Sequence, residues 1–389
     1  MREVILAGLN VVSDGLFMDN AYIHMRNGKI VYVGKNDKTS FPAHIPVRTY
    51  DDDTTALPGF IDVHIHGGYG VDVMDATEDV FTTLGEKLPT EGTTAYLATT
   101  ITSSKARTVQ ALQQCAQSVK KLGSAELLGV HLEGPFIHPD KRGAQPLQHI
   151  ERADVEMFAE FQRAADGTIR IVTLAPEIEG ANKLLQKCND ERVIASIGHT
   201  TVDYETLEQL VQDKPMHVTH LYNAMPGLHH RAPGVVGAAF TFPSLKSELI
   251  VDGMHSKAGA VRSAFQAIGS DRLFLITDSM RAKGMPDGDY DLGGQTVRVH
   301  GEKATLEDGT LAGSVLRMND AVRLMRTFTD ASWEDVAKMT SWNQAKALNI
   351  SNRKGNVAAG FDADVVLFGQ DVLQETWCAG QLRFEEGSK

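Results

Sequence analysis

The sequence predicts an α/β protein with a (β/α)8 barrel of the TIM type and a small β-sandwich domain formed by both chain termini. Eight apolar runs typical of strands recur through the middle of the chain, and each interval between them has room for a helix and two loops. Strand patterns also occur at both ends of the chain. The length of 389 residues fits one large domain with an appendage, because single cores stop growing near about 250–300 residues.

The predicted barrel strands are short apolar runs, several of them closed by polar residues. Eight strands separated by helical stretches favour a closed barrel over an open sheet. The eight runs are Leu57–His66, Thr93–Ile101, Glu126–Glu133, Ile169–Leu174, Arg192–His199, His217–Leu221, Glu248–Asp252 and Arg272–Asp278. Two further segments, Met318–Phe328 and Trp333–Leu348, are predicted to be helices that complete the ring.

The two strand-rich ends are predicted to form one small sheet domain, because isolated hairpins are only marginally stable and chain termini often lie close together. We place this domain at residues 1–55 plus 355–389 and the barrel at residues 56–354. The strand patterns behind it are Val4–Leu6, Ala21–Met25, Ile30–Val33, Ala363–Phe368, Glu375–Cys378 and Gln381–Phe384.

Composition argues against several classes of protein. The net charge of −12 and the absence of any Lys/Arg run longer than two residues argue against a nucleic-acid partner, although an anionic small molecule could bind where positive groups converge. No stretch approaches the roughly 20 apolar residues that span a bilayer, and the first residues do not resemble a signal peptide. Cys115, Cys188 and Cys378 are isolated and odd in number, which argues against a disulfide framework. We therefore expect a cytoplasmic protein with no membrane partner.

The first predicted barrel strand ends in two histidines. Side chains alternate across a strand, so His64 and His66 share one face and could bind one metal ion. An accidental pair of core or surface histidines is the alternative. The preceding run Pro58–Val63 makes the pair the end of a buried strand, which favours the metal site.

Polar residues close other predicted strands in the same way. Glu133, His199 and His220 each follow an apolar run at the edge where the carboxyl ends of barrel strands meet. Each alone could be a helix cap, an ion-pair partner or a satisfied core residue. Together with the His64/His66 pair they predict a nitrogen and oxygen metal site that is open to water or substrate.

Asp278 closes the eighth strand and is the best candidate for a general base. A carboxylate beside a metal-bound water can take its proton and then pass it to a leaving group. The alternative is a helix N-cap, for which Asp is well suited. The convergence of the other polar residues favours catalysis.

The segment after the sixth strand contains a second polar cluster. Arg231 follows two histidines among glycines and prolines, and backbone N–H groups near Asn223 and Ala224 could add donors for an anionic group. A solvated surface loop is the alternative. His255, after the seventh strand, adds a further histidine at the same rim.

These motifs resemble the N-acetylglucosamine-6-phosphate deacetylase family of the amidohydrolase superfamily over nearly the whole chain. The matching segments are Pro58–His66, Leu132–Phe136, Gly198–Thr200, Thr219–Met225, Asp252–His255, Thr277–Asp278 and Leu311–Ser314. The resemblance implies hydrolysis of the N-acetyl group of N-acetyl-D-glucosamine 6-phosphate to D-glucosamine 6-phosphate and acetate, by a metal-activated hydroxide with Asp278 as general base and acid. It also implies a role in amino-sugar catabolism and cell-wall sugar recycling.

The resemblance assigns roles residue by residue. Glu133, His199 and His220 match the principal metal ligands of the family. The positions that match phosphate or substrate contacts are Ala144, Gln145, Asn223, Ala224, Arg231, His255, Leu311, Ala312 and Gly313. Gln145 stands where some members have His, which leaves open whether a ring nitrogen or an amide meets the acetyl or sugar oxygen.

Retention of His64 and His66 places the sequence with the members that hold two metal ions. The expected ligands are then His64, His66, Glu133 as a bridge, His199, His220 and Asp278. The ion is Fe²⁺ or Zn²⁺, with Mn²⁺ and Co²⁺ also admissible, because the donors are imidazole and carboxylate without thiolate. Members of the family are dimers, so we expect a homodimer in which Arg231 acts in trans.

Three other functions are compatible with parts of this pattern. An N-acetylgalactosamine-6-phosphate deacetylase differs only in the stereochemistry of one hydroxyl of its substrate. A cyclic-amide hydrolase of the dihydroorotase kind commonly has a carboxylated lysine on strand four, and Ile169–Pro176 contains no lysine. A non-catalytic sugar-phosphate sensor would not need six metal-type residues, one of which is also the candidate base.

Overall fold

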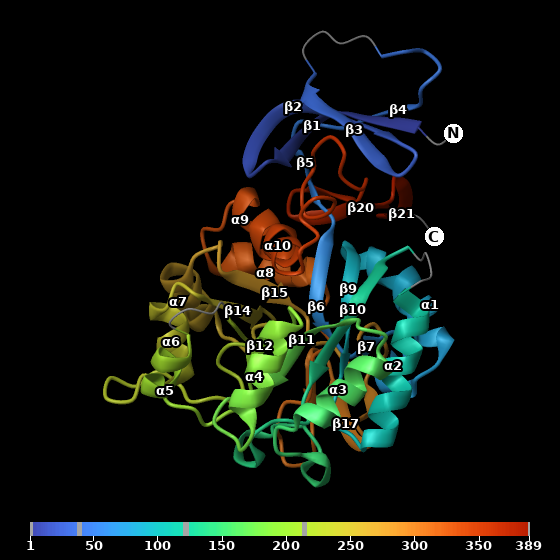
Figure 1. The fold of residues 1–389 in the computed structure, drawn as a ribbon. Coiled ribbons are helices and arrows are strands. Elements are labelled where there is room, and N and C mark those ends of the chain that lie inside the picture. The colour runs from blue at the N-terminus through green and yellow to red at the C-terminus, as the bar shows by residue number, and fades with distance from the viewer. Residues whose placement is uncertain (1–2, 37–40, 120–123, 212–215, 388–389) are drawn as a thin grey trace.

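The computed structural model describes residues 3–36, 41–119, 124–211 and 216–387. Two large sheets dominate the fold, one formed by both ends of the chain and one by its middle. Figure 1 shows the first sheet, in blue and red, stacked on one end of the barrel that contains the second. Within the described residues, no helix is long and apolar enough to cross a membrane.

The middle of the chain forms the predicted barrel. All neighbouring strands in its sheet are parallel. Backbone contacts join the ends of the first and last strands, where Asp278 N–H donates to His64 O at 2.8 Å and Ile65 bridges to Ser279. The eight strands are β6 (Phe60–Ile65), β9 (Thr93–Thr100), β10 (Glu126–Glu133), β11 (Ile169–Leu174), β12 (Ile194–Ile197), β13 (Met216–Val218), β14 (Leu245–Ile250) and β15 (Leu273–Ile276). The predicted fold class is confirmed.

Helices alternate with these strands. They are α1 (Glu78–Lys87), α2 (Lys105–Val119), α3 (Val155–Ala164), α4 (Ala181–Asp190), α5 (Tyr204–Leu210), α6 (Gly234–Thr241), α7 (Ala258–Ile268), α8 (Met318–Phe328), α9 (Trp333–Ala337) and α10 (Asn343–Ala347). A π-helical turn at Lys338–Trp342 divides the predicted helix Trp333–Leu348. Within this turn Ser341 Oγ donates to the carbonyls of Pro58 and Gly59 at 3.2 and 3.0 Å.

The sheet made from both termini also agrees with the expectation from sequence. Its strands are β1 (Glu3–Ser13), β2 (Leu16–Arg26), β3 (Lys29–Lys35), β4 (Val47–Thr49), β5 (Thr54–Pro58), β19 (Val365–Gly369), β20 (Val372–Cys378) and β21 (Gln381–Glu385). β5 joins the two ends, because it pairs with β1 on one side and β19 on the other. The predicted run Leu57–His66 therefore divides at Pro58-Gly59 between two sheets, and the terminal sheet extends past residue 55.

A three-stranded antiparallel sheet between β15 and α8 was not predicted. It consists of β16 (Gly288–Leu292), β17 (Gln295–His300) and β18 (Lys303–Thr305). Gln295 Nε2 donates to the carbonyl of Ala144 at 2.5 Å, and Gly293 lies against Ile101 and Pro146. This small sheet therefore supports the loop that carries Ala144 and Gln145.

Lys354 links the terminal sheet to the barrel, and its replacement by Met is expected to destabilise the protein. Its buried ammonium lies 2.5 Å from Asp364, just before β19, and 2.9 Å from Glu126 at the start of β10. Lys354→Met leaves the Asp364 carboxylate without this partner, so we expect the free energy of unfolding to fall by about 3 kcal/mol in urea titrations. Lys29→Met is the control, because the ammonium of Lys29 is half exposed and its pair with Asp362 is worth at most about 1 kcal/mol. Equal effects of the two variants would contradict the prediction.

Candidate active site

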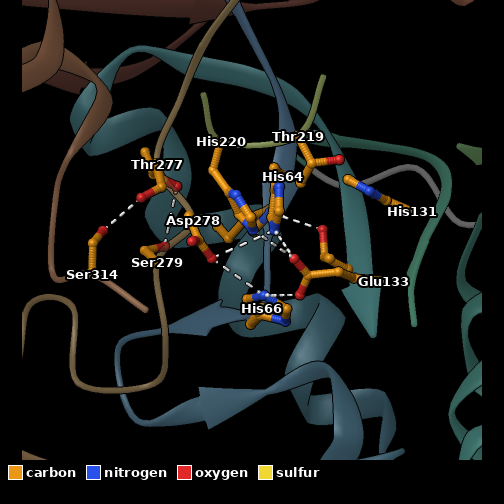
Figure 2. A network of polar contacts seen from close by, with 12 residues as sticks. His64, His66, His131, Glu133, Thr219, His220, Thr277, Asp278, Ser279 and Ser314 are labelled. Atoms are coloured by element: carbon orange, nitrogen blue, oxygen red, sulfur yellow. Dashed lines mark hydrogen bonds and ion pairs between the residues drawn. The ribbon is translucent and has the colours of Figure 1, made fainter. Parts of the chain in front are cut away.

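Six polar side chains from five strand ends meet at the carboxyl end of the barrel. His64 and His66 come from the end of β6 and Glu133 from the end of β10, while His199, His220 and Asp278 follow β12, β13 and β15. Figure 2 shows His64, His66, Glu133, His220 and Asp278 pointing toward one another. All six are less than 10% exposed. The structure thus brings together every residue predicted as a metal ligand.

The backbone turns sharply where three of these side chains enter the site. His199, His220 and Asp278 have φ values of 49°, 32° and 48°, in the left-handed region that non-glycine residues rarely adopt. Such conformations persist only where surrounding contacts hold them. Asp278 N–H donates to His64 O, and His220 N–H donates to Glu248 Oε2 at 3.3 Å.

Glu133 lies at the centre of the cluster. Its Oε1 lies 3.2 Å from His220 Nε2, 3.3 Å from His199 Nε2 and 3.5 Å from His64 Nε2, and its Oε2 lies 3.3 Å from His66 Nε2. The Oδ1 atom of Asp278 lies 3.3 Å from His66 Nε2 and 3.5 Å from His64 Nε2. One carboxylate therefore contacts four imidazoles, and the second contacts two of them.

Two of the imidazoles present unprotonated nitrogens to this centre when neutral. His199 Nδ1 donates to the carbonyl of Lys141 at 2.8 Å, so its Nε2 carries a lone pair in the neutral ring. His64 Nδ1 faces Glu248 Oε2 at 2.9 Å, and its buried Nε2 has no hydrogen-bond partner among the described residues. The Nε2 atoms of His199 and His220 are only 3.1 Å apart. Converging lone pairs of this kind fit a bound cation.

The imidazoles also hold both carboxyl groups in their charged form. Burial raises the pKa of Asp278, but the charge of His64 and the contact with His66 outweigh it and lower that pKa to about 2. Burial likewise raises the pKa of Glu133, and His64, His199, His220 and His66 together lower it well below its usual range. Asp278 is therefore available as a proton acceptor at neutral pH.

Two groups of residues that could hold a divalent ion share Glu133. One is His64, His66 and Glu133, and the other is Glu133, His199 and His220, with ligand atoms within 4.8 Å of one another in each group. Imidazole and carboxylate donors suit Zn²⁺, Fe²⁺, Mn²⁺ and Co²⁺. The site residues thus fit a divalent metal ion, and Glu133 belongs to both groups.

A third group, His64 with His131 and Glu248, does not fit a metal. His131 Nδ1 donates to the carbonyl of Val63 at 2.9 Å, and its Nε2 lies 2.7 Å from Thr173 Oγ1. Burial, followed by the charge of His64, lowers the pKa of His131 to about 4, so the ring is neutral at pH 7. Both nitrogens of this ring are already engaged.

A cavity of about 340 Å³ opens above the cluster. The metal-type residues His66, Glu133, His199, His220 and Asp278 form its floor. The residues predicted as substrate contacts that line it are Ala144, Gln145, Asn223, Ala224, His255 and Leu311. Three predicted contacts lie elsewhere in the described part of the chain: Ala312 is fully buried, Gly313 packs against Met280, and Arg231 is exposed.

The family follows from comparison with known proteins. A model described as the amidohydrolase family matches residues 55–383. The chain belongs to the amidohydrolase family. It is 46% identical over 389 residues to N-acetylglucosamine-6-phosphate deacetylase of Bacillus subtilis (strain 168), with 98% of each chain covered.

Two further comparisons bear on the substrate of this amidohydrolase. N-acetylgalactosamine-6-phosphate deacetylase of Escherichia coli O157:H7 is 36% identical over 341 residues, which cover 87% of this chain and 90% of that protein. The chain also matches a solved structure of a variant N-acetyl-D-glucosamine-6-phosphate deacetylase from Mycobacterium smegmatis, with a TM-score of 0.91 and 28% identity. That structure is a complex with N-acetyl-D-glucosamine-6-phosphate. That match covers 98% of this chain and 100% of the other. The resemblance inferred from the motifs is confirmed.

Gln145 of this amidohydrolase is held firmly beside the metal-type residues. Its Oε1 accepts from Thr102 N–H at 2.7 Å, which fixes the orientation of the amide. Its Nε2 donates to Glu133 Oε2 at 2.6 Å. Each end of the amide therefore has one partner within the protein.

Sequence reasoning missed several residues of the site. The cavity wall also includes Ile101, Asp140, Lys141, Gly143 and Thr310. Ile101 directly follows β9, and the other four lie in a short 3-10 helix or in loops, which leave no periodic signal. Asp62 is fully buried and accepts from His64 N–H at 3.1 Å and from Thr277 Oγ1. Its position two residues before His64, on the same face of β6, could have revealed it.

Proposed function

We propose that this amidohydrolase hydrolyses the N-acetyl group of N-acetyl-D-glucosamine 6-phosphate, giving D-glucosamine 6-phosphate and acetate. The observation that carries the proposal is the set of four histidines and two carboxylates beneath the 340 Å³ cavity. The likeness to the Bacillus subtilis deacetylase along 98% of both chains supports the same reaction.

The side chains have distinct roles in this proposal. Two divalent ions would be held by six side chains, with Glu133 common to both groups of ligands: His64, His66, Glu133, His199, His220 and Asp278. When bound, such ions polarise a carbonyl and lower the pKa of water. Asp278 takes a proton from the attacking water and delivers it to the departing amine, which must leave as the neutral amino group.

Residues that line the cavity are the candidates for contacts with the substrate. His255 Nδ1 lies 2.6 Å from Asp252 Oδ2, and Asp252 Oδ1 also accepts from the N–H groups of Met254 and His255. This arrangement turns Nε2 of His255 away from Asp252, and we assign it to a sugar or phosphate oxygen. Leu311 and Ala144 supply apolar wall. Gln145 contributes through Glu133, and the second N–H of its amide stays available for substrate.

Asn223, Ala224 and Arg231 bind the phosphate in this proposal. Asn223 and Ala224 line the cavity, whereas Arg231 is exposed and, within the described residues, is not part of the wall. A homodimer that brings Arg231 of one subunit to the cavity of the other reconciles these placements with the predicted role. Free, buried Cys115, Cys188 and Cys378 support a reducing cytoplasm as the location. The net charge of −12 supports the absence of a nucleic-acid partner.

Arg231→Ala tests the phosphate role. Loss of a charge-assisted contact to phosphate should raise KM for N-acetylglucosamine 6-phosphate by at least about 10-fold, because such contacts contribute roughly 1.5–3 kcal/mol. KM for unphosphorylated N-acetylglucosamine should change little. Steady-state kinetics with both sugars measure the difference, and Arg262→Ala on α7 is a control for loss of a positive charge. Equal losses for the two sugars would show that Arg231 does not bind phosphate.

The second candidate substrate is N-acetylgalactosamine 6-phosphate, which the Escherichia coli relative favours. Acetate release from the two epimers by the purified protein, combined with elemental analysis, tests the reaction, the epimer and the metal content together. We expect a higher kcat/KM for the glucosamine epimer and two ions per subunit. A higher kcat/KM for the galactosamine epimer would reverse the assignment, and no acetate from either would refute the reaction.

A further inference from the structure

A carboxylate below the site has no role in the proposed reaction. Glu248, on β14, is completely buried. Its Oε2 lies 2.9 Å from His64 Nδ1 and accepts from His220 N–H at 3.3 Å. Its backbone carbonyl accepts from Leu221 N–H at 2.8 Å. One residue of β14 therefore contacts the segments that carry two of the proposed metal ligands.

The contact with His64 determines which ring nitrogen carries the proton. An ionised carboxylate only accepts hydrogen bonds, so His64 Nδ1 must be the donor. The neutral ring then presents the lone pair of Nε2, which faces Glu133 and Asp278. The other tautomer would place the Nδ1 lone pair against Glu248 and an N–H where a metal is expected to bind.

Among the four described histidines proposed as metal ligands, His64 is the one whose ring is held by a carboxylate outside the cluster. His199 Nδ1 uses the carbonyl of Lys141, while the Nδ1 atoms of His66 and His220 have no partner there. His131, whose ring centroid lies 4.6 Å from that of His64, cannot replace Glu248 because both of its nitrogens are engaged.

We propose that Glu248 is a positioning residue that fixes the tautomer and orientation of His64 and thereby sets the affinity for the ion held by His64 and His66. This inference rests on the proposed two-ion site. Outer partners of this kind typically change metal affinity by about 10- to 100-fold. The ion held by Glu133, His199 and His220 depends less on Glu248, because the contact there is a longer one to the backbone of His220.

Metal binding by Glu248 variants tests the inference without an activity assay. Protein stripped with a chelator is titrated with Zn²⁺ against a competing dye, and its fold is checked by circular dichroism. We expect Glu248→Leu to keep one tight ion and to bind the second about 10- to 100-fold more weakly than the wild type. Glu248→Gln should lose less, because its amide oxygen can still accept from His64 Nδ1. Ser247→Ala, a neighbouring buried polar position on β14, is the control and should bind both ions normally.

Several outcomes would overturn the inference. They are wild-type affinity for both ions in Glu248→Leu, equal weakening of both ions, or an equal loss in Glu248→Gln and Glu248→Leu. Should Glu248→Leu fail to fold, ¹⁵N chemical shifts of the His64 ring in Zn²⁺-loaded wild type decide, since the inference requires a protonated Nδ1 and a metal-bound Nε2, and a metal-bound Nδ1 would overturn it. Failure of the proposed function would appear differently, as a wild-type protein that binds no ions or releases no acetate.

Discussion

Asp278→Asn is expected to lower kcat by about 10²- to 10⁴-fold, the range for loss of a general acid and base. The amide has nearly the shape of the carboxylate, and the backbone contacts of Asp278 with His64 and Ser314 do not depend on its side chain. The asparagine amide, however, cannot accept the proton of the attacking water. Because four imidazoles and Glu133 remain, the metal content should stay close to that of the wild type. Acetate release and elemental analysis on the same preparation measure both quantities.

Asp72→Asn provides a matched control for this experiment. Asp72 is a buried carboxyl near the site that accepts from Met74 N–H, and burial raises its pKa to about 6. It does not line the cavity as the described residues define it. We expect kcat to remain within about 10-fold of the wild type in this variant. A near-normal kcat in Asp278→Asn would refute its catalytic role, and loss of metal in the same variant would show that Asp278 acts chiefly as a ligand.

The barrel could be predicted because its strands leave a strong local signal. Each is a short buried run, and the polar residues at the carboxyl ends of five strands identify the functional edge before any contact is known. Glu133 is an example. A carboxylate at the end of a buried apolar strand needs polar or cationic partners, so its presence there indicates a functional site. The structure places that carboxylate 3.2–3.5 Å from three imidazoles through Oε1 alone.

The features that sequence missed depend on contacts between distant segments. β5 and β6 read as one run, because the division at Pro58-Gly59 appears only when β5 pairs with β1 and β19. Glu248 was recognised only as the start of an apolar run, since nothing local shows that its side chain reaches a histidine on another strand. The pairing of Gln145 with Glu133 is equally non-local. Sequence motifs show which residue types stand at the strand ends. The hydrogen bonds that orient these side chains join distant segments and can be identified only from the three-dimensional structure.

Glu133→Gln is expected to weaken metal binding by more than the roughly 10- to 100-fold that is typical of outer-shell changes. Gln145 Nε2 donates to Glu133 Oε2 at 2.6 Å, so the new amide should turn its oxygen toward Gln145. Its NH₂ group then takes the position of Oε1, where it faces Nε2 of His64, His199 and His220 and occupies lone pairs that would bind an ion.

Loss of ions and loss of turnover should therefore coincide in Glu133→Gln, with less than one ion per subunit and no measurable acetate release. Glu177→Gln changes the same charge nearby and is the matched control, because Glu177 contacts Thr200 and Thr201 beside His199 without facing the cluster. It should keep both ions. If Glu133→Gln also kept two ions, the bridge would have to lie elsewhere. If it kept one ion, Glu133 would be required for only one of the two.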